Sequence, residues 1–442
     1  MLEISKGARV ALDILHTHGY EAYLVGGCVR DMVMGVRAHD YDITTSATPN
    51  QMKRAFWGQR IIETGIKHGT LTFVYEKEPI EITTYRIEGE YKDNRHPESV
   101  VFTTELKSDL CRRDFTMNAL VYNEREGIID LFGGLDDIKS KLVRAVGEPE
   151  KRFTEDALRI LRGMRFASTL GFEIEEKTRA AMIKCAPLLK SISGERINCE
   201  LGKLLVGKNV GGVLRSCREV FEVILPVIKQ MNGFLQHTKY HIYDVWEHTV
   251  RTVENIEPKA HLRLTMLLHD TGKPSKFTMD AHGVGHFYGH GTVSCEIAKE
   301  FLEKYKYDNF TKARVLELIK IHDTPIEPDR VLIKKRINRI GKDTFFELLR
   351  VKRADDLAKS PEYKTTEVLD KIEDIANEII KEECFTLASL KISGYDLILL
   401  GFMGREIGKA LDLLLNEVIE EKIENEKDTL IKRAKELLGE GQ

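Results

Sequence analysis

The 442-residue sequence has few cysteines and no long apolar run, and each shortage excludes a class of protein. Its seven cysteines are scattered and never spaced C-x-x-C, which excludes a disulfide framework and a zinc knuckle. No stretch approaches about 18 consecutive apolar residues, so we expect no transmembrane helix and no membrane partner. Acidic Glu3 occupies the region where a secretory signal needs basic residues, and we therefore expect a cytoplasmic protein.

Net charge is also nearly absent, because 67 basic residues oppose 70 acidic residues. Any nucleic-acid binding must therefore come from local patches rather than from the field of the whole chain. With 11 prolines and 42% apolar residues, the composition is that of an ordinary globular protein and not of a disordered one. At roughly 100 to 200 residues per domain, the length predicts about three domains.

The chain changes its pattern near residue 150. Between Ala22 and Gly147, short β-type runs such as AYLVGG, LTFVY and IEITTYRI alternate with helical stretches. Beyond Lys151, helical periodicity continues almost to the end. The sequence therefore predicts an α+β fold in which a mixed head is followed by helical domains.

A pair of glycines follows the first strand-like run, and Arg30 lies in the helix-forming stretch behind it. Gly26 and Gly27 let the backbone approach a ligand closely, and a helix N-terminus offers N–H groups to a phosphate. Taken alone, such a pair is more often only a tight connection. It gains weight from the acidic residues that follow.

Asp40 and Asp42 lie about ten residues later on an expected strand. Because strand side chains alternate, both aspartates project to one face while Tyr41 and Ile43 face the core. Phosphoryl transfer needs divalent metals held by such carboxylates, and Glu81 on another expected strand is the candidate third ligand. We predict a catalytic Mg²⁺ site here, whereas a solvated strand end is the alternative for an isolated D-x-D pair.

A helix is predicted over residues 154–167, with Thr154 as its N-cap. At 100° per residue, one arc of this helix carries four charged side chains: Asp156, Arg159, Arg162 and Arg165. The pattern predicts a polar face that binds a ligand. A ladder of ion pairs on a solvated surface is the alternative.

Histidines and aspartates recur in the helical part in the order H…HD…H…D, at His248, His269-Asp270, His290 and His322-Asp323. This order resembles the HD superfamily of metal-dependent phosphohydrolases, in which helices bring imidazole and carboxylate groups onto a divalent ion. The expected ligands are His248, His269, Asp270 and Asp323, for Mn²⁺, Ni²⁺, Co²⁺, Fe²⁺ or Mg²⁺. A retained scaffold without catalysis is the alternative.

Five ordered motifs resemble those of the class II tRNA nucleotidyltransferases, which comprise CCA-adding enzymes and the closely similar bacterial poly(A) polymerases. The motifs are GGCVRD (26–31) with DYD (40–42), RRDFTMNA (112–119), DLFGG (130–134), EDALR (155–159) and SGERI (193–197). The resemblance implies a polymerase-β-like nucleotidyltransferase head at 1–148, a helical neck at 149–232, an HD body at 233–360 and a helical tail at 361–442. It covers nearly the whole chain.

The resemblance also implies an activity, the template-independent addition of C, C and A to the 3′ end of tRNA from CTP and ATP. It assigns base selection to Asp156 and Arg159, and triphosphate and ribose contacts to Gly27, Arg30, Arg113, Arg162 and Arg165. The charged segment 86–100 corresponds to a loop associated with the switch from C to A addition, which implies ATP use. No obligate protein partner is implied.

Three alternatives remain open at this point. The same chemistry could add only A or a poly(A) tail. In a different class, the chain would be an HD phosphohydrolase acting on RNA ends, with a head that only grips RNA. A non-catalytic RNA-binding protein is the third alternative, although loss of Asp40 or Asp42 would be expected there.

Overall fold

The computed structural model describes residues 3–38, 40–66, 69–89, 100–382 and 386–440, which form two compact units. The first unit comprises Met1–Lys229 and Glu303–Tyr307, and the second comprises Gln230–Leu302 and Asp308–Gln442. Residues 90–99 of the expected nucleotide-switching loop lie outside the described residues. The four-domain division of the chain stays a prediction.

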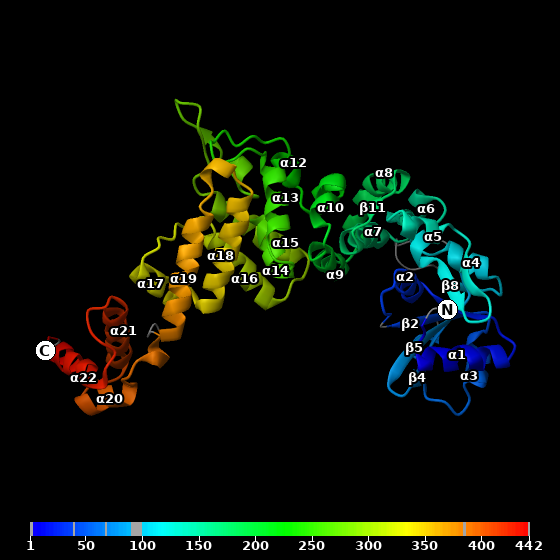
Figure 1. The fold of residues 1–442 in the computed structure, drawn as a ribbon, viewed down its shortest axis with the longest axis horizontal. Coiled ribbons are helices and arrows are strands. Elements are labelled where there is room, and N and C mark those ends of the chain that lie inside the picture. Colours follow the sequence, from blue (N-terminus) through cyan, green and yellow to red (C-terminus); the bar gives the residue numbers. More distant parts are fainter. Residues whose placement is uncertain (1–2, 39, 67–68, 90–99, 383–385, 441–442) are drawn as a thin grey trace. The chain divides into compact units, whose positions relative to one another are not determined.

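A seven-stranded mixed sheet forms the head (Figure 1), in the order β3-β4-β5-β2-β1-β8-β9. Its strands are β1 (Ala22–Val25), β2 (Tyr41–Thr45), β3 (Ile61–Ile62), β4 (Thr70–Tyr75), β5 (Glu78–Thr84), β8 (Leu120–Asn123) and β9 (Gly127–Asp130). β2 and β5 pair in parallel, whereas the other neighbours pair antiparallel. A separate ribbon joins β6 (Arg86–Glu88) to β7 (Val100–Phe102).

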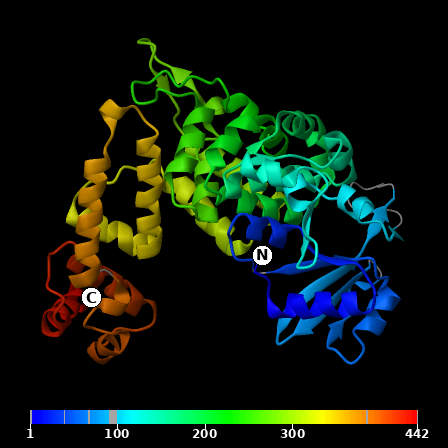
Figure 2. The same ribbon diagram turned by 45° about the vertical axis from the view of Figure 1, so that its right-hand side comes forward.

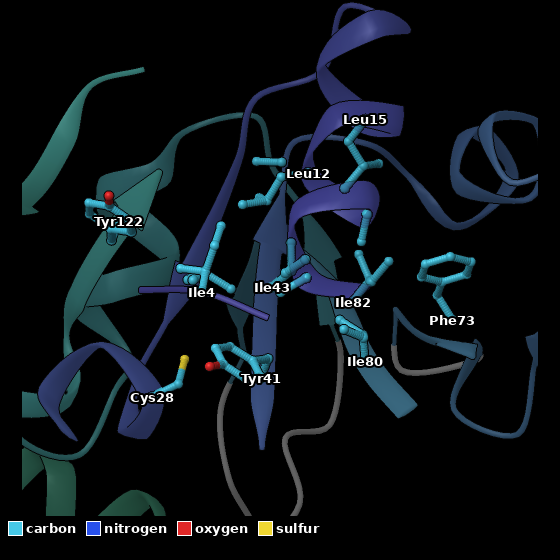
Figure 3. Close-up of a cluster of buried hydrophobic side chains, with 14 of the residues drawn as sticks. Ile4, Leu12, Leu15, Cys28, Tyr41, Ile43, Phe73, Ile80, Ile82 and Tyr122 are labelled. Carbon is cyan, nitrogen blue, oxygen red and sulfur yellow. The ribbon is translucent and has the colours of Figure 1, made fainter. Parts of the chain in front are cut away.

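Helix α1 (Lys6–Thr17) covers one face of this sheet. It begins where the Ser5 side chain accepts a hydrogen bond from the backbone N–H of Ala8, which satisfies one of the free donors of the first turn. Figure 3 shows Leu12 and Leu15 reaching from this helix toward the apolar side chains of the sheet. The opposite face carries a second apolar cluster that includes Tyr23, Val25 and Val121, and the side chain of Asp42 projects to that face as well.

The turn between β4 and β5 sets the register of the sheet. Only Glu76 and Lys77 separate the paired ends of the two strands, and their φ angles are 45° and 77°. Two positive φ angles in a two-residue loop match the twist that a β-hairpin requires. The resulting register places Thr72 opposite Glu81.

The remaining helices of the first unit are short. They are α2 (Gly27–Val33), α3 (Pro49–Ala55), α4 (Leu106–Cys111), α5 (Gly134–Lys139), α6 (Pro149–Glu155), α7 (Leu158–Leu170), α8 (Glu176–Cys185), α9 (Gly194–Leu205), α10 (Val210–Ser216) and α11 (Arg218–Ile224). The mixed head and the helices behind it confirm the α+β class. A small departure is that a short strand, β11 (Glu173–Ile174), lies inside the region expected to be all-helical and pairs in parallel with β10 (Leu142–Val143) of the head.

The second unit is mainly helical, as expected. Its helices include α13 (Val245–Asn255), α14 (Ala260–Leu268), α15 (His290–Lys304), α16 (Asn309–Ile321), α17 (Arg330–Ile340), α18 (Lys342–Leu357), α19 (Thr366–Glu382), α20 (Gly394–Leu400), α21 (Arg405–Ile419) and α22 (Lys427–Glu440). Figure 2 shows the long helices α18 and α19 side by side, and they are in contact. Two short strands, β12 (Thr278–Met279) and β13 (Gly285–His286), form a hairpin within the glycine-rich segment.

No helix among the described residues is long and apolar enough to cross a membrane.

Candidate functional site

The carboxylates expected to hold Mg²⁺ lie on and beside neighbouring parallel strands. Asp42 on β2 is directly opposite Glu81 on β5. The expected alternation is present, because Tyr41 and Ile43 are buried whereas Asp42 is exposed on the other face. Asp40, just before β2, is also exposed. The sequence therefore brings these three acidic residues to one region of the sheet.

Electrostatics at this region favours a cation. Partial desolvation by the surrounding protein and the nearby Glu81 carboxylate raise the pKa of Asp42, the charge of Asp40 adds to this, and Arg113 opposes it. Like charges that cannot separate raise one another's pKa, and a divalent ion would relieve their repulsion. The donor atoms are not gathered as closely as those of the second unit described below. The Mg²⁺ ligand set therefore stays a prediction.

Arg113 lies beside the glycine turn that precedes α2. A Cβ added to Gly26, whose φ is 82°, would lie 3.2 Å from Nη1 of Arg113. The guanidinium is 3.7 Å from the buried carboxylate of Asp109, and its buried Nε has no hydrogen-bond partner among the described residues. The turn therefore needs glycine at this position, and Arg113 retains a donor for a further acceptor.

Three of the arginines implied as triphosphate or ribose contacts meet around one aromatic ring. The guanidinium carbons of Arg30, Arg162 and Arg165 lie 5.1, 5.6 and 4.2 Å from the centre of the Phe166 ring. Each guanidinium also has its own carboxylate partner, at 2.7 Å for Arg30–Asp31, 2.7 Å for Arg162–Asp114 and 3.0 Å for Arg165–Glu200. These contacts fix the directions of the three cations before any ligand binds.

Asp114 is the most strongly perturbed of these carboxylates. Burial alone would raise its pKa, but the ion pair with Arg162 and the hydrogen bond from Asn118 outweigh burial and lower the pKa to about 2. The same Asn118 side chain accepts a hydrogen bond from Arg30 at 2.8 Å. Asp114 and Asn118 therefore couple two of the arginines, a role that sequence reasoning missed although both residues lie in the quoted RRDFTMNA motif.

The helix predicted over residues 154–167 is broken, and this part of the prediction is wrong. α6 ends at Glu155, Asp156 has extended backbone angles, and α7 begins at Leu158. Thr154 does not cap a helix start, because its hydroxyl donates to backbone carbonyls within α6. At the break, the Asp156 carboxylate accepts a hydrogen bond from the Leu158 backbone N–H, a local contact that competes with continuation of the helix.

The two residues implied in base selection have separate partners in the structure. Asp156 pairs with Arg196 at 3.1 Å. Arg159 is buried and donates to the Glu155 carboxylate at 2.9 Å and to the Arg112 backbone carbonyl at 3.0 Å. Arg196 was quoted in a motif but was given no role from the sequence. Its contact with Asp156 joins residues 40 positions apart.

The second unit gathers side chains that can hold a metal ion. The expected His248, His269 and Asp270 lie together, but their fourth member is Asp355 on α18. Asp323 is exposed just beyond the end of α16. It lines the pocket that Asp270 and Asp355 also line, but it is not part of the group of possible metal ligands. Asp355 carries no sequence signal, because a lone aspartate on a helix 85 positions from Asp270 resembles any surface charge.

Comparison with known families supports the motif-based reading. Residues 22–144 match the poly A polymerase head domain. Residues 171–231 match a candidate RNA and SrmB-binding site of polymerase A, and residues 290–434 match a candidate domain 2 of tRNA nucleotidyltransferases.

Individual relatives point the same way. The CCA-adding enzyme of Enterococcus faecalis is 49% identical over 212 residues, which are 48% of this chain and 52% of that protein. The enzyme of Geobacillus kaustophilus is 49% identical over 200 residues, which are 45% and 49% of the two chains. The chain thus spans about half the length of the curated relatives it matches.

Solved structures resemble the chain over almost its full length. The Bacillus stearothermophilus CCA-adding enzyme in complex with CTP has 29% identity and a TM-score of 0.69, covering 98% of both chains. The Thermotoga maritima CCA-adding enzyme complexed with tRNA has 20% identity and a TM-score of 0.64, covering 98% of this chain and 94% of that one, and it supports the fold alone.

Fold, motifs and family matches together define a nucleotidyltransferase head on a helical body. The chain resembles the CCA-adding enzymes and bacterial poly(A) polymerases, the class II tRNA nucleotidyltransferases, whose domains match three separate segments of it. That its body is an HD domain stays a prediction.

Proposed function

We propose that this protein adds C, C and A to the 3′ end of tRNA, using CTP and ATP and no nucleic-acid template. The observation that carries the proposal is the pairing of Asp42 with Glu81 beside Arg113 and the Gly26 turn. This arrangement puts metal-binding oxygens next to a donor for phosphate. An A-adding enzyme and a poly(A) polymerase are the alternatives within the family.

In this proposal, Asp40, Asp42 and Glu81 would hold Mg²⁺, which would supply activation of the attacking hydroxyl and neutralisation of the triphosphate charge. The terminal 3′-oxygen of the RNA forms a bond to the α-phosphorus, the bond between that phosphorus and the bridging oxygen of pyrophosphate breaks, and pyrophosphate and the hydroxyl proton leave. Arg113 donates to the triphosphate through its unpaired Nε.

The remaining arginines would orient the nucleotide. Arg30, Arg162 and Arg165 converge on the Phe166 ring, where their charges favour the triphosphate and their N–H groups can donate to ribose oxygens. Gly27 lies at the start of α2, close to Arg30, where a bare backbone permits close approach.

Base selection would use Asp156 and Arg159. Cytosine and adenine both present an exocyclic amine beside an unprotonated ring nitrogen, which match a carboxylate acceptor and a guanidinium donor. Uracil and guanine present a carbonyl and a ring N–H, which would face like partners. In the described structure Arg159 donates to Glu155 instead, so base binding would require it to exchange this partner.

The test uses tRNA transcripts that lack one, two or three of their terminal nucleotides. Each is incubated with purified protein and labelled CTP or ATP, supplied separately and together. We expect CTP to be added to the two shorter transcripts and ATP to the longest. If ATP alone is added to every transcript, or if long A tracts form, the proposal of CCA addition is wrong and the A-adding enzyme or the poly(A) polymerase takes its place.

For the second unit we propose a metal-dependent phosphohydrolase activity on phosphate esters such as RNA ends. The observation that favours it is the buried group of His248, His269, Asp270 and Asp355. Imidazole together with carboxylate suits Mn²⁺, Ni²⁺, Co²⁺, Fe²⁺ or Mg²⁺. Hydrolysis of phosphate esters that requires one of these metals and disappears in a His269→Ala-Asp270→Ala variant, with nucleotide addition intact, would support this activity.

A further inference from the structure

Asp109 is a buried carboxylate that joins strand β2 to the RRDFTMNA motif. It lies on α4 and is 0% exposed, and acidic side chains are almost never fully buried unless they are paired. We propose that Asp109 is a positioning residue for nucleotidyl transfer, which directs Arg113 toward the triphosphate and Arg159 toward the base. The proposal rests on the proposed function of the first unit and adds to it a residue that touches no substrate.

The contact of Asp109 with β2 is made through Thr44. The Thr44 hydroxyl donates to Oδ2 of Asp109 at 3.0 Å, and both side chains are fully buried. Thr44 follows Asp42 by two positions, and because side chains alternate along a strand, the two residues project to the same face of the sheet. Leu110 of α4 packs in the apolar cluster of that face. Asp109 therefore ties α4 to the strand that carries an expected Mg²⁺ ligand.

The remaining contacts of the carboxylate fix the two arginines of the motif. Oδ1 of Asp109 accepts hydrogen bonds from Nε and Nη2 of Arg112 at 3.0 and 2.7 Å, a charge-assisted contact that sets the direction of the guanidinium. Oδ2 lies 3.7 Å from Nη2 of Arg113, which is near enough for an ion pair and too far for a hydrogen bond. Asp109 thus attracts Arg113 without occupying the donors that a phosphate would need.

The charge of Asp109 is retained despite its burial. Burial alone would raise its pKa, but the charges of Arg112 and Arg113 and the hydrogen bonds from Arg112 and Thr44 outweigh burial and lower the pKa. Arg113 is attracted by Asp42 as well, although more weakly than by Asp109. A neutral side chain at position 109 would leave Asp42 as the competing partner and would turn Arg113 away from the triphosphate.

The same segment also holds the residue implied in base selection. The carbonyl oxygens of Cys111 and Arg112 accept hydrogen bonds from Arg152 at 2.9 Å and from Arg159 at 3.0 Å. The last carbonyls of a helix have no partner within the helix, so the two guanidiniums satisfy the end of α4. Because Asp109 fixes the side chain of Arg112, it also fixes the carbonyl that orients Arg159.

A purely structural role is the competing interpretation, in which Asp109 only neutralises two largely buried cations. The two interpretations differ in what they expect of Thr44. Thr44 carries no charge, so its loss would leave the neutralisation intact and would remove only the link between α4 and β2.

The experiment combines Asp109→Asn, Thr44→Val and the double variant in the full-length protein. Calorimetric titration in the presence of EDTA measures the Kd of CTP, ATP, UTP and pyrophosphate without any metal ion. We expect Asp109→Asn to weaken pyrophosphate binding about tenfold and to reduce the preference for CTP over UTP about tenfold. Thr44→Val should change both quantities about threefold in the same direction. The double variant should match Asp109→Asn, because Thr44 acts only through the carboxylate.

Thr45→Val is the matched control. Thr45 is the next residue of β2 and is equally buried, but its hydroxyl donates to the Glu21 carbonyl at 2.6 Å. This variant should leave pyrophosphate binding and base preference unchanged. Thr44→Ser keeps the hydroxyl and should retain the wild-type values.

The proposal is overturned if Asp109→Asn lowers stability in urea without changing pyrophosphate binding or base preference. It is also overturned if Thr44→Val and Thr45→Val act equally, or if the effects of Thr44→Val and Asp109→Asn add in the double variant. Should Asp109→Asn fail to fold, the comparison of Thr44→Val with Thr44→Ser and Thr45→Val decides alone.

Failure of the proposed function gives a different result. Wild-type protein that binds neither CTP nor ATP would refute the nucleotidyl transfer itself and the role of Asp109 with it. Wild-type protein that binds both nucleotides, with all variants unaffected, would refute only the positioning role of Asp109.

Discussion

Replacing Asp114 by Asn tests how this carboxylate contributes to the stability of the first unit and to nucleotide binding. The carboxylate accepts hydrogen bonds from Nε and Nη2 of Arg162 at 2.9 and 2.7 Å and from the Asn118 amide at 3.1 Å. An Asn at this position keeps the shape of the side chain but removes the charge. The partly exposed Arg162 guanidinium then loses its buried counterion.

The size of the effect follows from the pKa of Asp114, which falls from 3.8 to about 2 on folding. A difference of this size, at about 1.4 kcal/mol per pKa unit, corresponds to about 2 to 3 kcal/mol of stability. Because the folded pKa is the lower one, this contribution is complete above the unfolded pKa and is lost as the pH falls through the folded pKa. We expect Asp114→Asn to lower the free energy of unfolding by about 2 kcal/mol at pH 7 and by about half of that at pH 3.

Urea denaturation of the wild type and the variant between pH 7 and pH 3 measures the change in stability. Steady-state kinetics with CTP measure the change in nucleotide binding. The KM for CTP should rise several-fold because Arg162 is no longer held in place. Asp137→Asn is the matched control, since Asp137 is also buried and hydrogen-bonded, to Thr116, and is assigned no part in nucleotide binding. The reasoning is refuted if the stability difference does not shrink toward low pH, or if both variants change the KM equally.

Three further predictions concern the first unit. Asp42→Asn should lower incorporation of CTP and ATP by several orders of magnitude in a protein that still folds, which primer-extension rates and circular dichroism would check. Gly26→Ala should raise the KM for CTP more than Gly19→Ala does. Both glycines have positive φ, but only a Cβ at position 26 would contact a guanidinium, that of Arg113. Equal effects of the two variants on the KM would mean that backbone strain alone matters. The Asp156→Ala variant should lose about ten- to hundredfold of the preference for CTP and ATP over UTP and GTP, because an unmade hydrogen bond costs about 1 to 3 kcal/mol. The Arg196→Ala variant should lose part of the same preference. Competition among the four labelled nucleotides measures both, and unchanged selectivity in Asp156→Ala would make its contact with Arg196 structural.

Local patterns predicted the head well, because its geometry depends on short-range rules. Alternation along β2 was enough to put Asp42 on the face opposite Tyr41 and Ile43. The pairing of Asp42 with Glu81 needed a guess, since no pattern in one strand reveals which strand lies beside it. The register of β2 against β5 agrees with that guess, and the binding of Mg²⁺ by these residues stays a prediction.

Two side-chain contacts, one local and one long-range, explain what sequence reasoning missed. The helix over residues 154–167 seemed continuous because its periodicity was continuous, yet the Asp156 side chain competes with the backbone for the Leu158 N–H. Asp355 could not be chosen over Asp323, because only the packing of α18 against α13 and α14 brings it to the histidines. The first outcome was decided by a local hydrogen bond between a side chain and the backbone, and the second by the packing of distant helices.

The Glu76-Lys77 turn has a consequence for how this family can vary in length. Adding or deleting one residue in this turn would shift β5 against β4 by one position and carry Glu81 to the face that packs against α1. Changes by two residues would preserve its direction but move it along the strand, away from Asp42. We therefore expect related sequences to vary in residue type at this turn, above all to Asn and Gly, because these residues adopt positive φ readily. We expect the length of the turn not to vary.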